Sequence, residues 1–304
     1  MLARTVVLNL GYNKAKDLFV NPTGKENTQI RAFCSAKTLI TWHLEEMATI
    51  CRERTGGGSF LLSSAIPEGV IGSHSGMTAE GDNRVLMQKV VKDILSDTQK
   101  GIHDLPEMTM CPKREIPTKT SVTDFDTLRN LMFYKEIAEI KTFSKLLQKK
   151  IMENGESFFD VWMYQVSDEI QSLAIAFGNR YMLAGALQYL ADLTDAKTKV
   201  VLEATIRLHM LHFVKQNLSW YLINGTVSEQ AASNFDAEYD QAVKDYVPHM
   251  NTVVGALGVP ETPNRLGPIA RDYVAYTSQP DAENYDSAGP VFDFRTTGAP
   301  RPRL

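Results

Sequence analysis

The chain has 304 residues, of which 43% are hydrophobic and 22% charged, and its formal net charge is −4. This composition is ordinary for a globular protein with one large or two medium domains. The slight negative charge gives no electrostatic reason to expect nucleic acid as a partner, and no apolar run reaches the roughly 18 residues of a membrane span. The three cysteines, Cys34, Cys51 and Cys111, are widely spaced, which fits a reducing compartment and argues against a disulfide scaffold.

The N-terminal third predicts three helices. Residues 2–19 have apolar side chains at helical spacing and predict a helix without a capping residue before it. A second, long helix is predicted over about 28–54 and is broken by "TGGGSF". Residues 60–80 are polar and rich in glycine and predict a loop, followed by a third helix over about 83–95. Because the first helix has no lead-in, we expect the protein to continue upstream.

The composition changes after residue 98. Residues 99–122 contain prolines with little hydrophobic periodicity, which is typical of a domain linker. Four long helical patterns follow, each ending in a turn former or helix cap: 125–153, 156–192, 196–223 and 228–256. Sustained strand alternation is almost absent, so the sequence predicts an all-α fold. The predicted parts are a partial helical bundle over 1–98, the linker over 99–122, a second bundle over 123–276 and a tail over 277–304.

The turn "MTAEGDNRV" places an acid just before the third predicted helix. Capping that helix requires only Asp82 or Asn83, either of which can accept a bond from a free backbone donor. Glu80 is surplus to capping, and Gly81 behind it allows a tight turn or the close approach of another molecule. These residues alone are consistent with a simple surface turn and with a functional site.

Three consecutive glycines, Gly56, Gly57 and Gly58, follow the second predicted helix. One glycine is enough for a left-handed helix end. The extra glycines expose backbone amides that can donate to a phosphate oxygen. The pattern is therefore consistent with a phosphate-binding segment and with a flexible loop.

Two further patterns favour structure over chemistry. His209 and His212 have a spacing that can bind a metal, but no carboxylate lies close by on the same predicted face, so we predict structural histidines and no metal site. Seven aromatic residues of the second bundle recur at helical spacing and are predicted to lie mostly in the core or at an oligomer interface. They are Trp162, Tyr164, Phe177, Tyr181, Tyr189, Trp220 and Tyr221.

Taken together, "CRERTGGGSF" and the later "GMTAEGDNRVLMQKV" resemble the acyl-CoA oxidases. In that family a Cys-Arg-Glu-Arg segment leads into a Gly-Gly-x-Gly-aromatic loop, and a Glu-Gly-Asp/Glu-Asn turn opens the next helix. The likeness continues to "LGPIARDYVAYTS" and so covers essentially the whole chain. Two positions depart from the family pattern, with Thr55 where Cys is common and Ser59 where the third motif glycine is usual.

The resemblance implies an activity for these motifs. Glu80 matches the catalytic base, shielded from water, which takes the α-proton of a fatty acyl-CoA while the β-hydrogen leaves as hydride to FAD. The three glycines match the segment that packs against the adenosine-pyrophosphate half of FAD across a homodimer interface. Asp82 and Asn83 match residues near the flavin. Oxygen is the final electron acceptor, so the expected products are trans-2-enoyl-CoA and hydrogen peroxide, in the first step of fatty acid β-oxidation.

The resemblance also implies which part of such an enzyme is present. Family members carry an N-terminal helical domain and a β-domain, whereas this chain resembles the C-terminal half, so we expect it to be inactive alone. An acyl-CoA dehydrogenase is a less favoured alternative because those enzymes normally end after the first bundle. A non-catalytic helical dimerisation fragment, which pairs with a full-length relative, is an alternative of another class.

The last residues, Pro302, Arg303 and Leu304, resemble a peroxisomal address of the Ser-Lys-Leu class. The preceding tail is rich in Pro, Gly and Thr, which would keep this tripeptide accessible to an import receptor. We therefore expect the protein to be located in peroxisomes.

Overall fold

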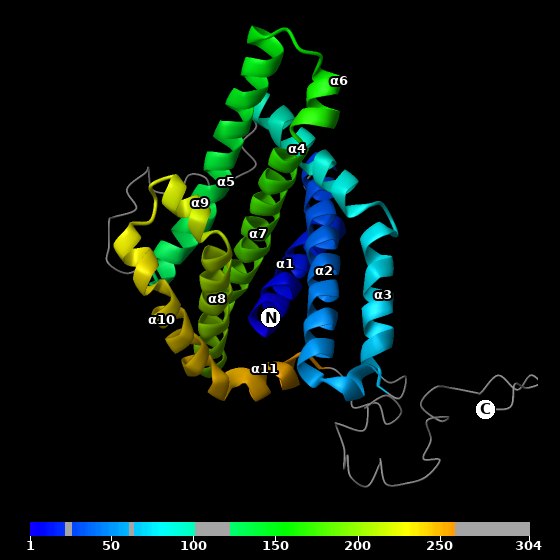
Figure 1. Cartoon of the computed structure of the whole chain (residues 1–304). Helices are drawn as coiled ribbons and strands as arrows, with labels where there is room; N and C mark the ends of the chain where they lie inside the picture. Colours follow the sequence, from blue (N-terminus) through cyan, green and yellow to red (C-terminus); the bar gives the residue numbers. More distant parts are fainter. Residues whose placement is uncertain (22–25, 61–63, 101–121, 259–304) are drawn as a thin grey trace, which may run out of the picture. The chain divides into compact units, whose positions relative to one another are not determined.

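The computed structural model describes residues 1–21, 26–60, 64–100 and 122–258, and within these ranges all regular elements are helical (Figure 1). This confirms the predicted all-α fold. The chain divides into two compact units. The larger unit comprises Met1–Ile40 and Thr78–Leu257, and the described part of the smaller unit is residues 41–60, 64–77 and 258.

The larger unit contains most of the helices. They are α1 (Leu2–Val20), the first part of α2 (Glu26–Thr55), α4 (Asn83–Gln99), α5 (Phe125–Gln148), α7 (Ser167–Asp192), α8 (Ala196–Gln216), α9 (Leu218–Ile223), α10 (Glu229–Tyr246) and α11 (Met250–Ala256). Shorter elements connect them: the π-helical turns η3 (Lys149–Glu153) and η4 (Val161–Gln165), the single turn α6 (Phe158–Asp160) and the 3-10 turn η5 (Val247–His249).

The helices predicted in this unit are present, but the four long patterns are subdivided. The pattern over 196–223, for example, breaks between α8 and α9 at Asn217, whose φ of −112° is not helical. The side-chain amide of Asn217 donates to the carbonyl oxygen of Phe213 at 2.8 Å and so satisfies an acceptor at the end of α8. Hydrophobic periodicity continues through such a break because both helices pack on the same core.

Helix α7 lies at the centre of the larger unit and contacts α1, α4, α5 and α8 (Figure 1). Its side chains are buried on nearly every face, as expected for a helix surrounded by others. Helices α1 and α7 cross closely at two glycines, because a Cβ placed on Gly185 would lie only 2.8 Å from the Cα of Gly11. Helices from both sides of the predicted linker therefore share one core; residues 101–121 of the linker are outside the described residues.

The aromatic residues divide between core and surface. Trp162, Phe177, Tyr181 and Tyr221 are buried, as predicted. Tyr164 and Tyr189 are instead 74% and 50% exposed, so helical spacing was not sufficient to place them in the core. Trp220 is the seventh residue of the predicted set. Its ring packs edge-on against that of Tyr221, with 5.2 Å between the ring centroids.

The smaller unit contains the last part of α2, the 3-10 turn η1 (Gly57–Phe60) and α3 (Ile66–Thr78). The prediction of a loop over 60–80 was wrong, since most of this segment is α3. Its glycines and serines lower helix propensity, which is why the sequence indicated a loop. One of these small residues serves packing, because a Cβ on Gly76 would lie 3.1 Å from the side chain of Thr41 in α2.

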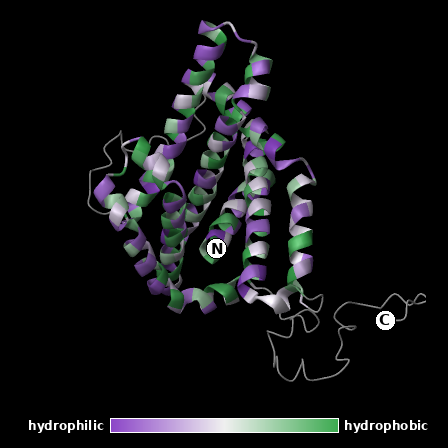
Figure 2. Cartoon of the chain, in the orientation of Figure 1, coloured by the Kyte–Doolittle hydropathy of each residue, from purple (hydrophilic) through white to green (hydrophobic). Residues whose placement is uncertain are grey.

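Polar and apolar residues alternate around the helices, as Figure 2 shows. Over the described ranges, none of the helices has the length and apolarity needed to cross a membrane.

Candidate functional site

The candidate catalytic turn begins after the last residue of α3 and ends at the first turn of α4. Glu80 lies in this turn outside both helices, as predicted, with a φ of 57° in the left-handed region that residues with a side chain rarely adopt. Gly81 follows with a φ of 104°. A Cβ on Gly81 would also lie 3.1 Å from Cδ2 of Leu86, so the position favours glycine for two reasons. A strained non-glycine residue of this kind is frequent at functional sites.

Asp82 and Asn83 divide the roles that the sequence left open. Asp82 is the N-cap of α4: its Oδ1 accepts hydrogen bonds from the backbone amides of Arg84 at 2.8 Å and Val85 at 3.3 Å. Asn83 is the first helical residue, and only 2% of it is exposed. Its side chain is therefore part of the interior of the unit rather than a cap.

Lys37 of α2 holds this turn in place, and sequence reasoning missed it. Its Nζ donates to the carbonyl oxygen of Gly81 at 2.7 Å and to Oδ1 of Asn83 at 2.8 Å. The only signal in the sequence was a lysine on a mainly apolar helix face, and the structure shows its side chain to be half-buried. Because its partners are more than 40 positions away in the sequence, the pattern of α2 could not identify them.

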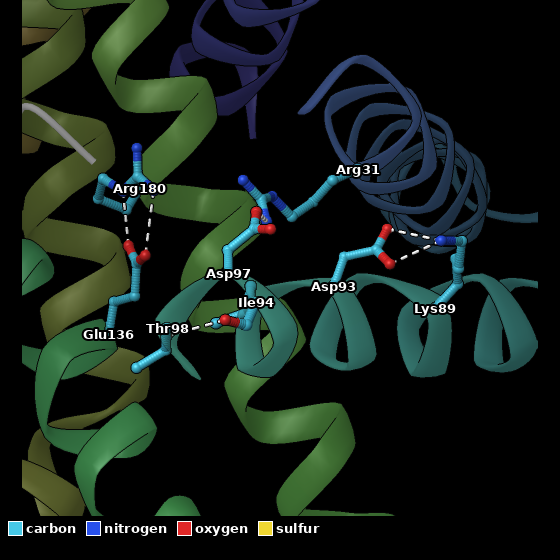
Figure 3. A network of polar contacts seen from close by, with 8 residues as sticks. All are labelled: Arg31, Lys89, Asp93, Ile94, Asp97, Thr98, Glu136 and Arg180. Carbon is cyan, nitrogen blue, oxygen red and sulfur yellow. Dashed lines mark hydrogen bonds and ion pairs between the residues drawn. The ribbon is translucent and has the colours of Figure 1, made fainter. Parts of the chain in front are cut away.

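Side chains from α7 and α2 also hold α4 itself, beyond the turn. Near its start, Nε2 of Gln171 in α7 donates to the carbonyl oxygen of Arg84 at 3.1 Å. Near its end, Asp97 forms a buried ion pair with Arg31 of α2, with 2.6 Å between Oδ2 and Nη1. Figure 3 shows this pair together with Lys89, which binds Asp93 one turn along α4. The start and the end of α4 are therefore both anchored to neighbouring helices.

A second buried ion pair joins α5 to α7. Nε of Arg180 lies 2.5 Å from Oε2 of Glu136, and its Nη2 lies 3.0 Å from Oε1 (Figure 3). The ring of Phe177 lies 5.0 Å from the guanidinium of Arg180 and 5.4 Å from that of Arg31. One aromatic ring thus makes a cation–π contact with the cation of each ion pair.

The side chain of Glu80 is exposed in this structure. The expected shielding of Glu80 from water is therefore not provided by the described residues of the chain. What the fold does provide is a backbone position fixed by Asp82, Lys37 and α4, from which the carboxylate projects outward.

The glycine segment belongs to the smaller unit. Gly56 ends α2 with a φ of 82°, and a Cβ on Gly56 or Gly57 would meet no atom within 4 Å. Ser59 is buried, and its Oγ lies within hydrogen-bond distance of two carbonyl oxygens, that of Arg52 at 2.7 Å and that of Gly56 at 2.6 Å. The serine that departs from the family pattern thus closes the end of α2, while Gly56, Gly57 and Gly58 form the turn before it.

The histidines of α8 have structural surroundings. His209 is 3% exposed, and Nδ1 of His212 lies 3.3 Å from the hydroxyl of Tyr239. Burial lowers the pKa of His212 to about 4, with the positive charges of the amino terminus, Arg4 and Lys215 adding to the effect. Among the residues that the structure describes, no group of three or more His, Cys, Asp or Glu side chains is arranged to hold a metal ion. Pro302, Arg303 and Leu304 lie outside those residues.

Two models of one protein family match the chain. The C-alpha1 domain of acyl-CoA oxidase matches residues 8–95, and the acyl-CoA oxidase domain matches residues 124–262. The chain belongs to the acyl-CoA oxidase family. The Glu80 turn and the glycine segment both lie within the first matched region.

Relatives and solved structures agree with this assignment. The chain is 26% identical over 299 residues to a putative peroxisomal acyl-coenzyme A oxidase 3.2 of Arabidopsis thaliana, covering 90% of this chain and 42% of the relative. It is 21% identical over 290 residues to an acyl-coenzyme A oxidase-like protein of Mus musculus, covering 84% and 46%. The chain thus spans less than half the length of these relatives.

The fold matches solved acyl-CoA oxidases. The structure of acyl-CoA oxidase-1 of Caenorhabditis elegans, complexed with FAD and ATP, has a TM-score of 0.79 at 13% identity and covers 97% of this chain and 47% of that one. Acyl-CoA oxidase 1 of Yarrowia lipolytica has a TM-score of 0.78 at 14% identity, covering 99% and 49%.

Proposed function

We propose that this chain supplies the catalytic base of an FAD-dependent acyl-CoA oxidase. The overall reaction converts a fatty acyl-CoA and oxygen into trans-2-enoyl-CoA and hydrogen peroxide. The observation that carries the proposal is Glu80, an acid with a left-handed backbone that is not used for capping. The residues after it are held by Lys37 and by the Asp82 cap, and the turn lies within a region that matches the family.

Glu80 would take the α-proton of the acyl thioester. Such a proton is very weakly acidic, so its removal requires a carboxylate held within about 3 Å of it in a dry site. The backbone anchors described above fix the position of Glu80, and Gly81 leaves space for an approaching molecule. The water exclusion that the reaction requires has to come from groups other than the described residues.

The glycine segment fits one half of FAD. The open space around Gly56 and Gly57 lets a phosphate reach the backbone amides there, which a side chain would hinder. When bound, FAD would supply the hydride acceptor. Asp82 and Asn83 would lie near the flavin, although both side chains already have structural partners in this chain. A homodimer would complete the binding site.

The runner-up function is a helical dimerisation module without activity of its own. The exposure of Glu80 favours this alternative. Colour separates the two functions: a chain that retains FAD purifies yellow, whereas a module without flavin purifies colourless.

Glu80→Gln tests the catalytic assignment in a full-length form of the protein. We expect binding of flavin and acyl-CoA to be kept and the rate to fall by orders of magnitude, because an amide cannot accept the proton. Glu68→Gln, an exposed change on α3, is the matched control. Near-normal oxidase activity of Glu80→Gln would remove this residue from the mechanism.

We also propose a peroxisomal location, supported by the C-terminal tripeptide and by the peroxisomal names of the Arabidopsis relatives. A fluorescent protein ending in "RTTGAPRPRL" should collect in peroxisomes and should disperse when Leu304 is deleted. A diffuse signal from the intact tail would contradict the location and leave the family assignment untouched.

A further inference from the structure

A cavity of about 500 Å³ opens among α1, α5, α7 and α8, and none of the residues that line it belongs to the Glu80 turn or the glycine segment. This volume lies in the range of small-molecule sites. Phe133 of α5 and Ala184 and Leu190 of α7 form buried parts of its wall, and each is less than 9% exposed. The wall therefore offers an apolar surface, and covering it with an apolar ligand is favourable because that surface is removed from water.

Positive charge from three helices surrounds this apolar wall. Lys14 of α1, Arg129 of α5 and Lys199 of α8 line the cavity, and Glu203 is the one carboxylate among the lining residues. The lining thus has a net charge of two positive units, in a chain whose overall charge is −4. Arg129 pairs with Asp126 at 3.2 Å, but the Asp126 side chain is 75% exposed, and an exposed pair of this kind exchanges partners at little cost.

We propose that this cavity binds a long-chain carboxylate, an aliphatic chain that ends in a single anionic group. The chain would cover the apolar wall between α5 and α7. The carboxylate would reach the cations at the rim, where Arg129 offers a paired-donor geometry and Lys199 a point charge. The combination of an apolar wall with cations on separate helices selects an amphipathic anion over an uncharged chain or a bare anion.

A second cavity provides an internal comparison. It has a volume of about 400 Å³, lies among α1, α8 and α11, and is lined mainly by apolar side chains with Lys197 as its one charged residue. Lys197 and Lys199 both lie near the start of α8 and are both exposed, yet they line different cavities. Replacing either lysine by glutamate therefore changes the net charge of the chain by the same amount. Only the change at Lys199 alters the charge of the residues that line the proposed site.

The test is a calorimetric titration of the 304-residue chain with dodecanoate below its micelle concentration, with dodecanol, inorganic phosphate and adenosine monophosphate as comparison ligands. We expect saturable binding of one dodecanoate and an affinity for dodecanol lower by about tenfold or more. Phosphate and adenosine monophosphate should not displace dodecanoate. Lys199→Glu should weaken dodecanoate binding by about tenfold, and Lys197→Glu should change it by less than about twofold.

A third variant blocks the cavity without a charge change. Ala191→Trp adds a large side chain at an exposed lining position, so the core remains intact while dodecanoate binding is lost. Circular dichroism should show the same helical content in all variants. The proposal is overturned if dodecanoate does not bind, if dodecanol binds equally well, if phosphate or adenosine monophosphate displaces it, or if the two lysine variants behave alike.

Discussion

Nζ of Lys37 lies 2.8 Å from Oδ1 of Asn83 and joins the middle of α2 to the first residue of α4. The same ammonium group holds the carbonyl oxygen of Gly81 at 2.7 Å, so one side chain restrains both sides of Asp82. The turn that presents Glu80 is thus stabilised by a residue that takes no part in the motif.

Replacing Lys37 should loosen this turn. For Lys37→Met we expect the free energy of unfolding to fall by about 1 kcal/mol, since two charge-assisted hydrogen bonds are lost at a half-buried position. Amide hydrogen exchange should accelerate at the start of α4 more than elsewhere. Lys92→Met, an exposed change on α4, should leave exchange there unchanged. Equal exchange rates in Lys37→Met and the wild-type chain would show that capping by Asp82 is sufficient.

Breaking the buried pair of Arg31 and Asp97 should be more costly. Asp97→Ala leaves the Arg31 charge in the core without its carboxylate partner, so we expect a loss of about 3–5 kcal/mol in urea unfolding. The double change Arg31→Met with Asp97→Leu should recover most of this loss, because neither of these two charges then remains buried. A double variant as unstable as Asp97→Ala would show that packing of α4, not charge, is the cause.

Close helix crossing at Gly185 predicts a large effect of one methyl group. Gly185→Ala places a Cβ 2.8 Å from the Cα of Gly11, so α1 and α7 must move apart, at a cost of about 1–3 kcal/mol. Gly255→Ala in α11 is the matched control, because nothing lies within 4 Å of its Cβ. This control should be neutral or stabilising, since alanine has the higher helix propensity. Thermal unfolding of both variants measures the difference.

The lowered pKa of His212 predicts a loss of stability in acid. Its pKa is about 4 in the folded chain and near the ordinary 6.5 when unfolded, so the unfolded state binds more protons between these two pH values. The free energy of unfolding should therefore fall as the pH drops from about 6.5 towards 4. Unfolding melts of His212→Gln should show a shallower fall over this range, whereas His74→Gln, an exposed change on α3, should not alter it. Identical slopes in His212→Gln and wild type would exclude His212 as the cause.

Local patterns in the sequence were sufficient to predict most of the helices and the position of the turn that contains Glu80. Hydrophobic periodicity identified the long helices, because burial of one face repeats at the helical period. Glu80 was identified as surplus because Asp82, which does cap α4, stands between it and the helix. The prediction failed at α3 because its glycines and serines lower helix propensity. Packing explains one of them, since a Cβ on Gly76 would lie 3.1 Å from the side chain of Thr41.

Contacts between distant segments were decided by the tertiary structure alone. The partners of Lys37, the ion pairs of Arg31 and Arg180, and the cations that meet at the cavity lined by Lys199 come from helices far apart in the chain. Each requires two side chains to meet through the packing of whole helices around α7, and no periodicity along one segment encodes which residue lies opposite. The sequence by itself determined most of the helices, though not α3, and the turn that carries the acid; the packing of the helices determined what holds that turn.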